Sequence, residues 1–164
     1  MMYWTDWGIT ARIEQASMDG SERRDFIITD LSQPNGIAID YQSGRVYWSD
    51  SDLDKLEFAS YDGSGRTSVE TEETGLLYPF AVSVGDNTLF WSDWATNTIY
   101  ATHKEHGADS NLGYFSAIAT LPTTPYGVEV LLSNTQAPGM CSSCFVGINL
   151  LLVCSLTVCV PTIL

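Results

Sequence analysis

The sequence predicts an all-β fold built from a repeated unit, and recurring markers support this. The tetrad "YWTD" at residues 3–6 returns as "YWSD" at 47–50 and "FWSD" at 90–93, at intervals of 44 and 43 residues. The turn sequence "DGS" at 19–21 recurs at 62–64, again 43 residues later. A proline before an apolar stretch keeps nearly the same spacing: Pro34, Pro79 and Pro125. Three markers in one register indicate a tandem repeat with a period in the forties.

The middle repeat predicts four strands in succession. "GIAIDY" (36–41) alternates β-branched with small or polar residues, and "RVYWSD" (45–50) follows a short turn. "KLEFASYD" (55–62) alternates again, and "RTSVETE" (66–72) is a more polar strand that suits an outer edge. Short strands separated by turn residues predict all-β structure, and no segment of the repeats has the apolar period of a helix.

A four-stranded antiparallel unit of about 43 residues that recurs in tandem is typical of a β-propeller blade. The first strand of each blade then lies beside the central channel and the fourth lies outside. This order explains why the first strands are apolar and the fourth is polar.

The recurring tetrad is predicted to build the blades rather than to carry chemistry. Its aromatic pair suits the layers between adjacent blades, because large flat rings bury much apolar area. Its Asp falls where the strand ends, and there a carboxylate can accept unpaired backbone N–H groups. The structural residues are Tyr3, Trp4, Thr5, Asp6, Tyr47, Trp48, Ser49, Asp50, Phe90, Trp91, Ser92 and Asp93.

These motifs, with the "DGS-x-R" turns and the "PNG" before an apolar strand, resemble YWTD repeats, also called low-density lipoprotein receptor class B repeats. Such repeats occur in lipoprotein receptors, Wnt co-receptors, the epidermal growth factor precursor and nidogen, and "YPFAV" (78–82) is most similar to nidogen. The resemblance covers residues 2–139 and implies part of a six-bladed propeller, about three blades of four-stranded antiparallel sheet. The count is strands 2–4 of one blade, two full blades, and a lone first strand at 126–132.

This count predicts that an upstream part of the protein is absent. It also leaves strand 2–6 without an inner neighbour and strand 126–132 without an outer one. Because unpaired strand edges are templates for aggregation, residues 1–139 expressed alone are not expected to be a stable monomer.

The predicted propeller ends at residue 139, and residues 140–164 form a second, mostly apolar segment. This segment contains all four cysteines of the chain: Cys141, Cys144, Cys154 and Cys159. Three interpretations stay open: a non-native reading of the gene, a membrane anchor or removable lipid-anchor signal within 144–164, and a structured extra segment. A span needs about 20 apolar residues, and this one lacks basic flanks and contains Asn149.

Composition and motifs exclude several function classes. A net charge of −13 argues against nucleic-acid binding, since no basic stripe exists to meet phosphates. No nucleophile, phosphate-loop or metalloprotease motif occurs, so we expect no enzyme activity, no cofactor and no metal site. The pair His103 and His106 is read as turn residues, and the Cys141–Cys144 pair lacks a matching partner pair. The enzymatic alternative is a metal-dependent propeller hydrolase with Asp and Asn side chains in the channel.

A binding surface is predicted where strand 1 begins and strand 2 ends, because antiparallel neighbours place these points on one face. The residues entering strand 1 are Gln33, Asn35, Tyr78, Phe80 and Tyr126; those leaving strand 2 are Trp7, Ser51 and Trp94. Aromatic and amide side chains on a rigid scaffold are typical of protein-binding hot spots. The alternative is that Trp7 and Trp94 only pack between blades.

The resemblance implies that this face holds a short Asn-containing ligand segment. Asn35 would meet the Asn of the ligand, and Tyr78 and Trp94 would form aromatic walls. The implied partner is a secreted or matrix protein, laminin-like or Wnt-pathway-like, bound outside the cell, and calcium binding is implied only for a longer parent protein. No signal peptide is evident at the N-terminus. The rival from another class is a purely architectural spacer.

Overall fold

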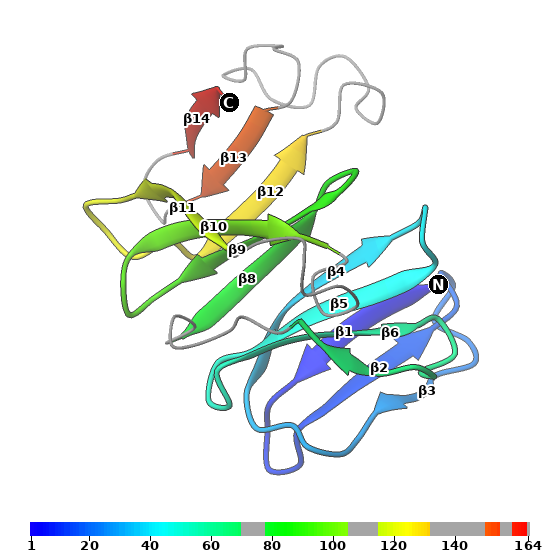
Figure 1. Ribbon diagram of the computed structural model, residues 1–164. Coiled ribbons are helices and arrows are strands. Elements are labelled where there is room, and N and C mark those ends of the chain that lie inside the picture. Colours follow the sequence, from blue (N-terminus) through cyan, green and yellow to red (C-terminus); the bar gives the residue numbers. More distant parts are fainter. Residues whose placement is uncertain (70–77, 105–114, 132–149, 155–158, 164) are drawn as a thin grey trace.

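The computed structural model describes residues 1–69, 78–104, 115–131, 150–154 and 159–163. In these residues the chain forms four antiparallel sheets, and the predicted all-β fold is confirmed (Figure 1). The first blade contains β1 (Met2–Asp6), β2 (Arg12–Ala16) and β3 (Arg24–Ile27). The second contains β4 (Pro34–Asp40), β5 (Arg45–Asp50), β6 (Lys55–Ser60) and β7 (Thr67–Ser68).

The third blade contains β8 (Pro79–Val84), β9 (Thr88–Asp93), β10 (Thr98–His103) and β11 (Ser116–Thr120). A fourth sheet contains β12 (Gly127–Leu131), β13 (Leu150–Cys154) and β14 (Cys159–Ile163). The strands of each sheet follow one another in chain order, so each blade is a simple meander. The inner strands of the second, third and fourth sheets lie beside one another, β4 against β8 and β8 against β12.

The expectation that the first strand of the fourth sheet lacks an outer neighbour is wrong. β12 pairs along its length with β13, and β13 pairs with β14. Two short apolar runs of the predicted C-terminal tail, β13 and β14, therefore supply strands to the last sheet. The predicted boundary at 139/140 lies outside the described residues and stays a prediction.

The core lies in layers between the blades, and the tetrad contributes to both sides of its own blade. Trp48 packs with Ile13 and Ile27 of the first blade, whereas its neighbour Tyr47 packs with Val82 and Leu89 of the third. Successive side chains of a strand point to opposite faces, so one aromatic pair fills two layers. Phe90 repeats this arrangement toward the fourth sheet, in a cluster with Val128.

Gly36 sets how closely the second and third blades approach. A Cβ atom at this position would lie 2.6 Å from the Phe80 carbonyl oxygen and 2.6 Å from the Val82 nitrogen, both backbone atoms of β8. Only glycine leaves this space, and here it permits two inner strands to touch.

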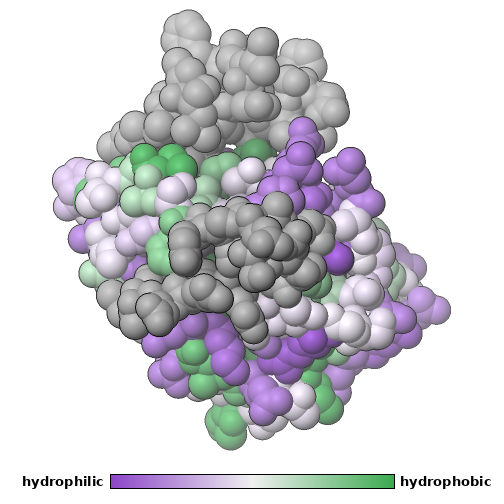
Figure 2. Space-filling view, viewed as in Figure 1, coloured by the Kyte–Doolittle hydropathy of each residue, from purple (hydrophilic) through white to green (hydrophobic). Residues whose placement is uncertain are grey.

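The outer surface is polar where the blades meet solvent. In the view of Figure 2, hydrophilic side chains cover most of the described surface of the first two blades, in keeping with the net charge of −13. Among the described residues, no helix has the length and apolar character needed to cross a membrane.

Candidate protein-binding face

The tetrad carboxylate organises the entry to each inner strand. Asp50 is fully buried, and its two oxygens accept backbone N–H groups from Ser32 at 2.8 Å, Gln33 at 3.0 Å and Leu53 at 3.2 Å. One side chain at the end of β5 therefore fixes both the approach to β4 and the turn that follows β5. A buried carboxylate with this many donors needs no countercharge.

The same arrangement recurs one blade later. Asp93 accepts the backbone N–H of Tyr78 at 3.1 Å and that of Thr96 at 2.9 Å. The turns that these carboxylates hold also share a left-handed residue, Asp54 with φ 52° and Asn97 with φ 53°. Asp and Asn tolerate this conformation better than other side chains that carry a Cβ atom.

The tetrad hydroxyl ties the first blade to the second and the second blade to the third. Thr5 donates to the Asn35 carbonyl at 3.0 Å, and Ser49 donates to the Phe80 carbonyl at 2.7 Å. Both acceptors lie in the inner strand of the following blade. The sequence does not reveal this role, because hydroxyl and carbonyl are about 30 residues apart.

An irregularity in the inner strands aims side chains at this face. The ladder of β4 with β5 shifts between Pro34 and Ile37, and that of β8 with β9 shifts between Pro79 and Val82. A β-bulge re-directs the side chains of its strand. The bulges contain Asn35 and Phe80, which the sequence analysis assigned to the binding face.

Four of the predicted residues form one aromatic group. The Trp94 ring stacks on Phe80 at 3.7 Å between centroids and on Tyr78 at 5.9 Å. Tyr126 meets the Trp94 ring edge-on at 4.8 Å, and the Trp94 indole N–H donates to the Pro125 carbonyl at 2.9 Å. Trp94 thus packs against both its own blade and the next sheet, and its role in binding a partner stays a prediction.

Three polar residues adjoin this aromatic group. Tyr78 donates its hydroxyl proton to Gln33 Oε1 at 3.1 Å, across the blade boundary. Asn35 Nδ2 donates to Ser51 Oγ, and Ser51 in turn donates to the Pro79 carbonyl at 2.7 Å. Seven of the eight predicted residues are therefore contiguous through contacts, and we call them, with Trp7, the strand-entry face.

Trp7 stands apart from the other seven. Its side chain is 58% exposed, and no hydrogen bond or ring contact joins it to the described part of the chain. Trp7 occupies the same position after the tetrad as Trp94. The following blade offers Asn35 where Trp94 meets Tyr126, and no described strand lies on the inner side of β1 to supply an equivalent of Phe80, so Trp7 has no ring on which to stack.

The strand-entry face has an acidic border. Burial, and then the charges of Asp93 and Asp52, raise the pKa of Asp54 above its ordinary value. Like charges that crowd a surface favour a partner of opposite sign. Among the described residues, no three His, Cys, Asp or Glu side chains are grouped in a way that could hold a metal ion. His103 ends β10, whereas His106, Cys141 and Cys144 lie outside the described residues.

Sequence reasoning missed a repeated ion pair that covers the tetrad tryptophan. Arg66 binds both carboxylate oxygens of Glu57, at 3.1 Å and 2.6 Å, and its guanidinium lies 5.5 Å from the Trp48 ring. Arg23 and Glu14 make the same pair over Trp4 in the first blade. The signal was present, because both members of the pair recur at 43 residues.

Comparison with known proteins identifies the repeats. Residues 1–41 match the family described as low-density lipoprotein receptor repeat class B. The chain contains class B repeats. It is 33% identical to the vitellogenin receptor Yl of Drosophila melanogaster over 92% of this chain and 8% of that protein. It is 34% identical to the human low-density lipoprotein receptor-related protein 5-like protein over 63% of this chain and 40% of that protein.

A class B propeller of known structure has the same arrangement. A chain in the crystal structure of a nidogen/laminin complex superposes with a TM-score of 0.64 and 32% identity, over 77% of this chain and 46% of that one. A streptogramin B lyase superposes with a TM-score of 0.61 at 18% identity, which shows a shared fold alone. The chain spans less than half the length of each of these proteins.

Proposed function

We propose that this chain is a non-enzymatic, protein-binding propeller module that acts outside the cell. The observation that carries the proposal is the strand-entry face, on which aromatic rings and amides from successive blades meet. Tyr, Trp and amide groups held by rigid strands supply contact area at a small cost in side-chain entropy. One relative is a receptor by name and another is named as receptor-related, which supports a role in binding rather than in catalysis.

The ligand segment would lie along the boundary between the second and third blades. The Asn35 amide Oδ1 has no hydrogen-bond partner in the described residues, and Gln33 Nε2 has none either. A ligand amide could bond to both groups while its neighbours rest on Tyr78 and Tyr126. The acidic border favours a basic segment around that amide.

The module could belong to a matrix protein or to a receptor, and the two would bind different protein partners. A matrix role like that of nidogen would use laminin, and a receptor role would use a secreted cargo such as vitellogenin or a Wnt-pathway ligand. We favour protein binding in either setting over a purely architectural spacer, because Trp7 is a large ring left exposed two residues after Thr5, whose hydroxyl bonds to the Asn35 carbonyl.

Binding of the full chain to immobilised laminin and to immobilised vitellogenin tests the proposal. Trp7→Ala and Asn35→Ala are the informative variants, since neither side chain is fully buried and Trp7 packs on nothing described. Met18→Ala is the control, because Met18 is 73% exposed and follows β2 at the opposite end of the strands. We expect at least about a tenfold weaker Kd for both variants with an unchanged melting temperature. Equal binding by all four proteins would contradict the proposal and favour the spacer.

A further inference from the structure

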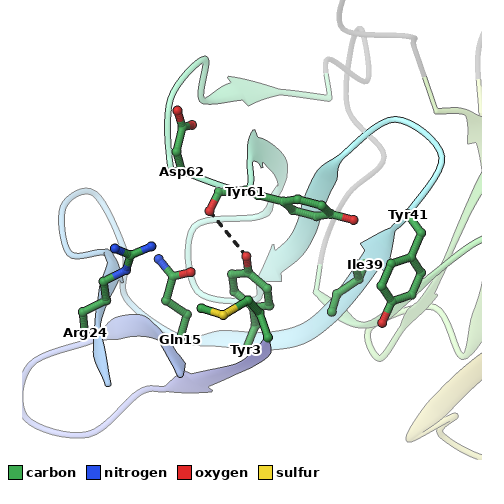
Figure 3. Close-up of a pocket in the computed structure, with 8 residues that line it drawn as sticks. Tyr3, Gln15, Arg24, Ile39, Tyr41, Tyr61 and Asp62 are labelled. Atoms are coloured by element: carbon green, nitrogen blue, oxygen red, sulfur yellow. Dashed lines mark hydrogen bonds between the residues drawn. The ribbon is translucent and has the colours of Figure 1, made fainter. Parts of the chain in front are cut away.

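A pocket of about 340 Å³ lies between the first and second blades, at the end of the strands opposite the strand-entry face (Figure 3). Its walls come from β1, β2, β3, β4 and the turn after β6. The residues used below are Tyr3, Gln15, Arg24, Tyr41, Tyr61 and Asp62. None of them belongs to the strand-entry face.

One side of the pocket is aromatic and held in place by hydrogen bonds. The Tyr61 hydroxyl donates to the Asp40 carbonyl at 3.2 Å, and the Tyr3 hydroxyl donates to the Tyr61 carbonyl at 3.4 Å. Tyr41 is 82% exposed and stands at the rim beside Ile39 (Figure 3). The hydrogen bonds hold the Tyr3 and Tyr61 rings in place, and all three rings offer flat apolar surfaces.

The other side is polar and contains an amide without a partner. Gln15 is only 3% exposed, and its Oε1 is buried without a hydrogen-bond donor in the described residues. The last torsion of a glutamine side chain is broad and twofold, so a half-turn of the amide exchanges Oε1 and Nε2. A ligand in the pocket that offers both a donor and an acceptor can therefore pair with this buried group.

Two side chains of opposite charge, Arg24 and Asp62, also line the pocket. Asp62 Oδ1 accepts the Ser64 N–H at 2.9 Å and the Ser64 hydroxyl at 2.6 Å, which leaves Oδ2 for a ligand. Arg24 places a guanidinium on the same side of the pocket and makes no ion pair with the described residues (Figure 3). Arg24 would repel a bound cation, whereas Asp62 and the net charge of −13 would repel a bound anion. The pocket therefore favours a neutral ligand.

The equivalent place between the second and third blades is filled. There Phe58 packs against Tyr47 at 5.2 Å between centroids, and the Arg45 guanidinium lies 4.6 Å from the Phe58 ring. Lys104 extends inward and contacts Asp40 at 2.8 Å. The blade geometry alone therefore does not require an open pocket.

The substitutions that open the pocket are specific to the first blade boundary. Gln15 stands where the next blade has Phe58, 43 residues later, and Tyr61 stands where it has Lys104. Met1 takes the place of Arg45 at the start of the tetrad strand. At these three positions the first blade boundary has an amide, an aromatic ring and an apolar side chain, where the next boundary has a phenyl ring and two cationic side chains.

We propose that this pocket binds one neutral sugar ring of a glycan. The C–H face of a sugar ring can lie on tyrosine rings, and adjacent hydroxyl groups can each both donate to a carboxylate and accept from a guanidinium or amide. Aromatic, amide, carboxylate and guanidinium groups around one small space suit such a ligand and no simple ion. The pocket is independent of the proposed protein-binding face.

Saturation-transfer NMR on the full chain tests the proposal, with neutral methyl hexosides and methyl N-acetylhexosaminides as probes. Acetate and methylguanidinium are the charged comparison probes. We expect transfer to at least one neutral glycoside, with a Kd on the order of 1 mM, as suits a ligand of this size. Tyr41→Ala and Gln15→Leu are expected to weaken it at least about tenfold. Ile9→Ala is the control, because Ile9 is fully exposed in the turn between β1 and β2, at the end of the strands away from the pocket, and it should bind the glycoside normally.

Tyr41 is too exposed for its truncation to unfold the chain, so the Tyr41→Ala result stands even if Gln15→Leu proves unstable. Absence of transfer to every neutral glycoside, stronger transfer to a charged probe, or equal binding by Tyr41→Ala would overturn the proposal. If a glycoprotein column retains the chain and the same column after enzymatic deglycosylation does not, the sugar that the pocket binds belongs to a glycoprotein partner. If the chain binds free glycoside but is not retained on the column, the ligand is a soluble saccharide.

Discussion

The second and third blades bury the same tryptophan of the tetrad in two different ways. Trp48 and Trp91 are both fully buried, and neither indole N–H has a hydrogen-bond partner in the described residues. Over Trp48 lies the guanidinium of Arg66, held by Glu57. In the third blade Tyr100 takes the place of Glu57 and stacks on Trp91 at 5.5 Å.

This difference shows which part of the repeat is fixed by the fold. The tetrad supplies the buried ring and the carboxylate in both blades, and its hydroxyl accepts a backbone N–H of its own inner strand, from Gly36 for Ser49 and from Ala81 for Ser92. The cover over the ring need only be flat and able to pack, so an Arg–Glu pair and an aromatic ring are equivalent solutions. Positions that differ between blades are therefore free to specialise, as Asn35 and Phe80 do on the strand-entry face.

The largest expected effect is at the boundary between these two blades. Gly36→Val places side-chain atoms against the β8 backbone, where even a Cβ atom would lie 2.6 Å from Phe80 O. We expect a loss of at least about 3 kcal/mol in the free energy of unfolding, or failure to fold. Thermal and urea denaturation measure it. Gly85→Ala is the control, because its added Cβ meets nothing closer than 3.6 Å; equal losses for both variants would contradict the role of close approach.

A smaller loss is expected when the carboxylate is removed from either blade. Asp50→Ala leaves two backbone N–H groups before β4 and one in the turn after β5 without their acceptor, and about 2–4 kcal/mol should be lost. Asp93→Ala should cost a similar amount, since the two residues hold equivalent turns. Asp19→Ala, which removes an exposed turn carboxylate, should cost much less stability than either of these variants. Urea denaturation of the three variants would refute equivalence if Asp93→Ala proved as mild as Asp19→Ala.

The sequence predicts the repeat and the strand order well, because both depend on local pattern. The bulge at Asn35 and Gly36 was not predictable in this way, since it depends on how closely β8 approaches. The difference between Trp7 and Trp94 required knowledge of the residue in the following blade. The Arg66–Glu57 pair could have been found from its 43-residue recurrence, whereas the strands after residue 149 could not, because no repeat marker precedes them.

The stability contributed by the groups that cover each tetrad tryptophan can be compared by substitution. Arg66→Lys removes the bidentate contact to Glu57 and the bonds to the Thr29 and Asp30 carbonyls, so about 2 kcal/mol of stability should be lost. Arg23→Lys should cost less, because the Arg23 side chain is 61% exposed rather than 19%. Tyr100→Phe keeps the ring and should change stability by less than about 0.5 kcal/mol. Chemical denaturation decides between these, and a large loss for Tyr100→Phe would mean that its hydroxyl, not its ring, is the cover.

The smallest expected effect is a pH dependence of the link between the second and third blades. Burial by itself raises the pKa of Asp40, but hydrogen bonds from Lys104 and Ser43 outweigh it and hold that pKa below its ordinary value of 3.8. A carboxyl whose pKa is lower in the folded chain stabilises the fold above the unfolded value and loses this contribution as pH falls through the folded one. The double variant Asp40→Asn/Lys104→Met should therefore show a shallower fall in melting temperature than the unmodified chain between about pH 5 and pH 2. The exposed pair Asp6–Arg12, 3.5 Å apart, gives the matched control Asp6→Asn/Arg12→Met, which should leave the slope nearly unchanged because exposed pairs contribute little. If the two double variants fell in parallel with the unmodified chain, the Asp40–Lys104 pair would not be a source of acid sensitivity, and the blade boundary would depend on packing alone.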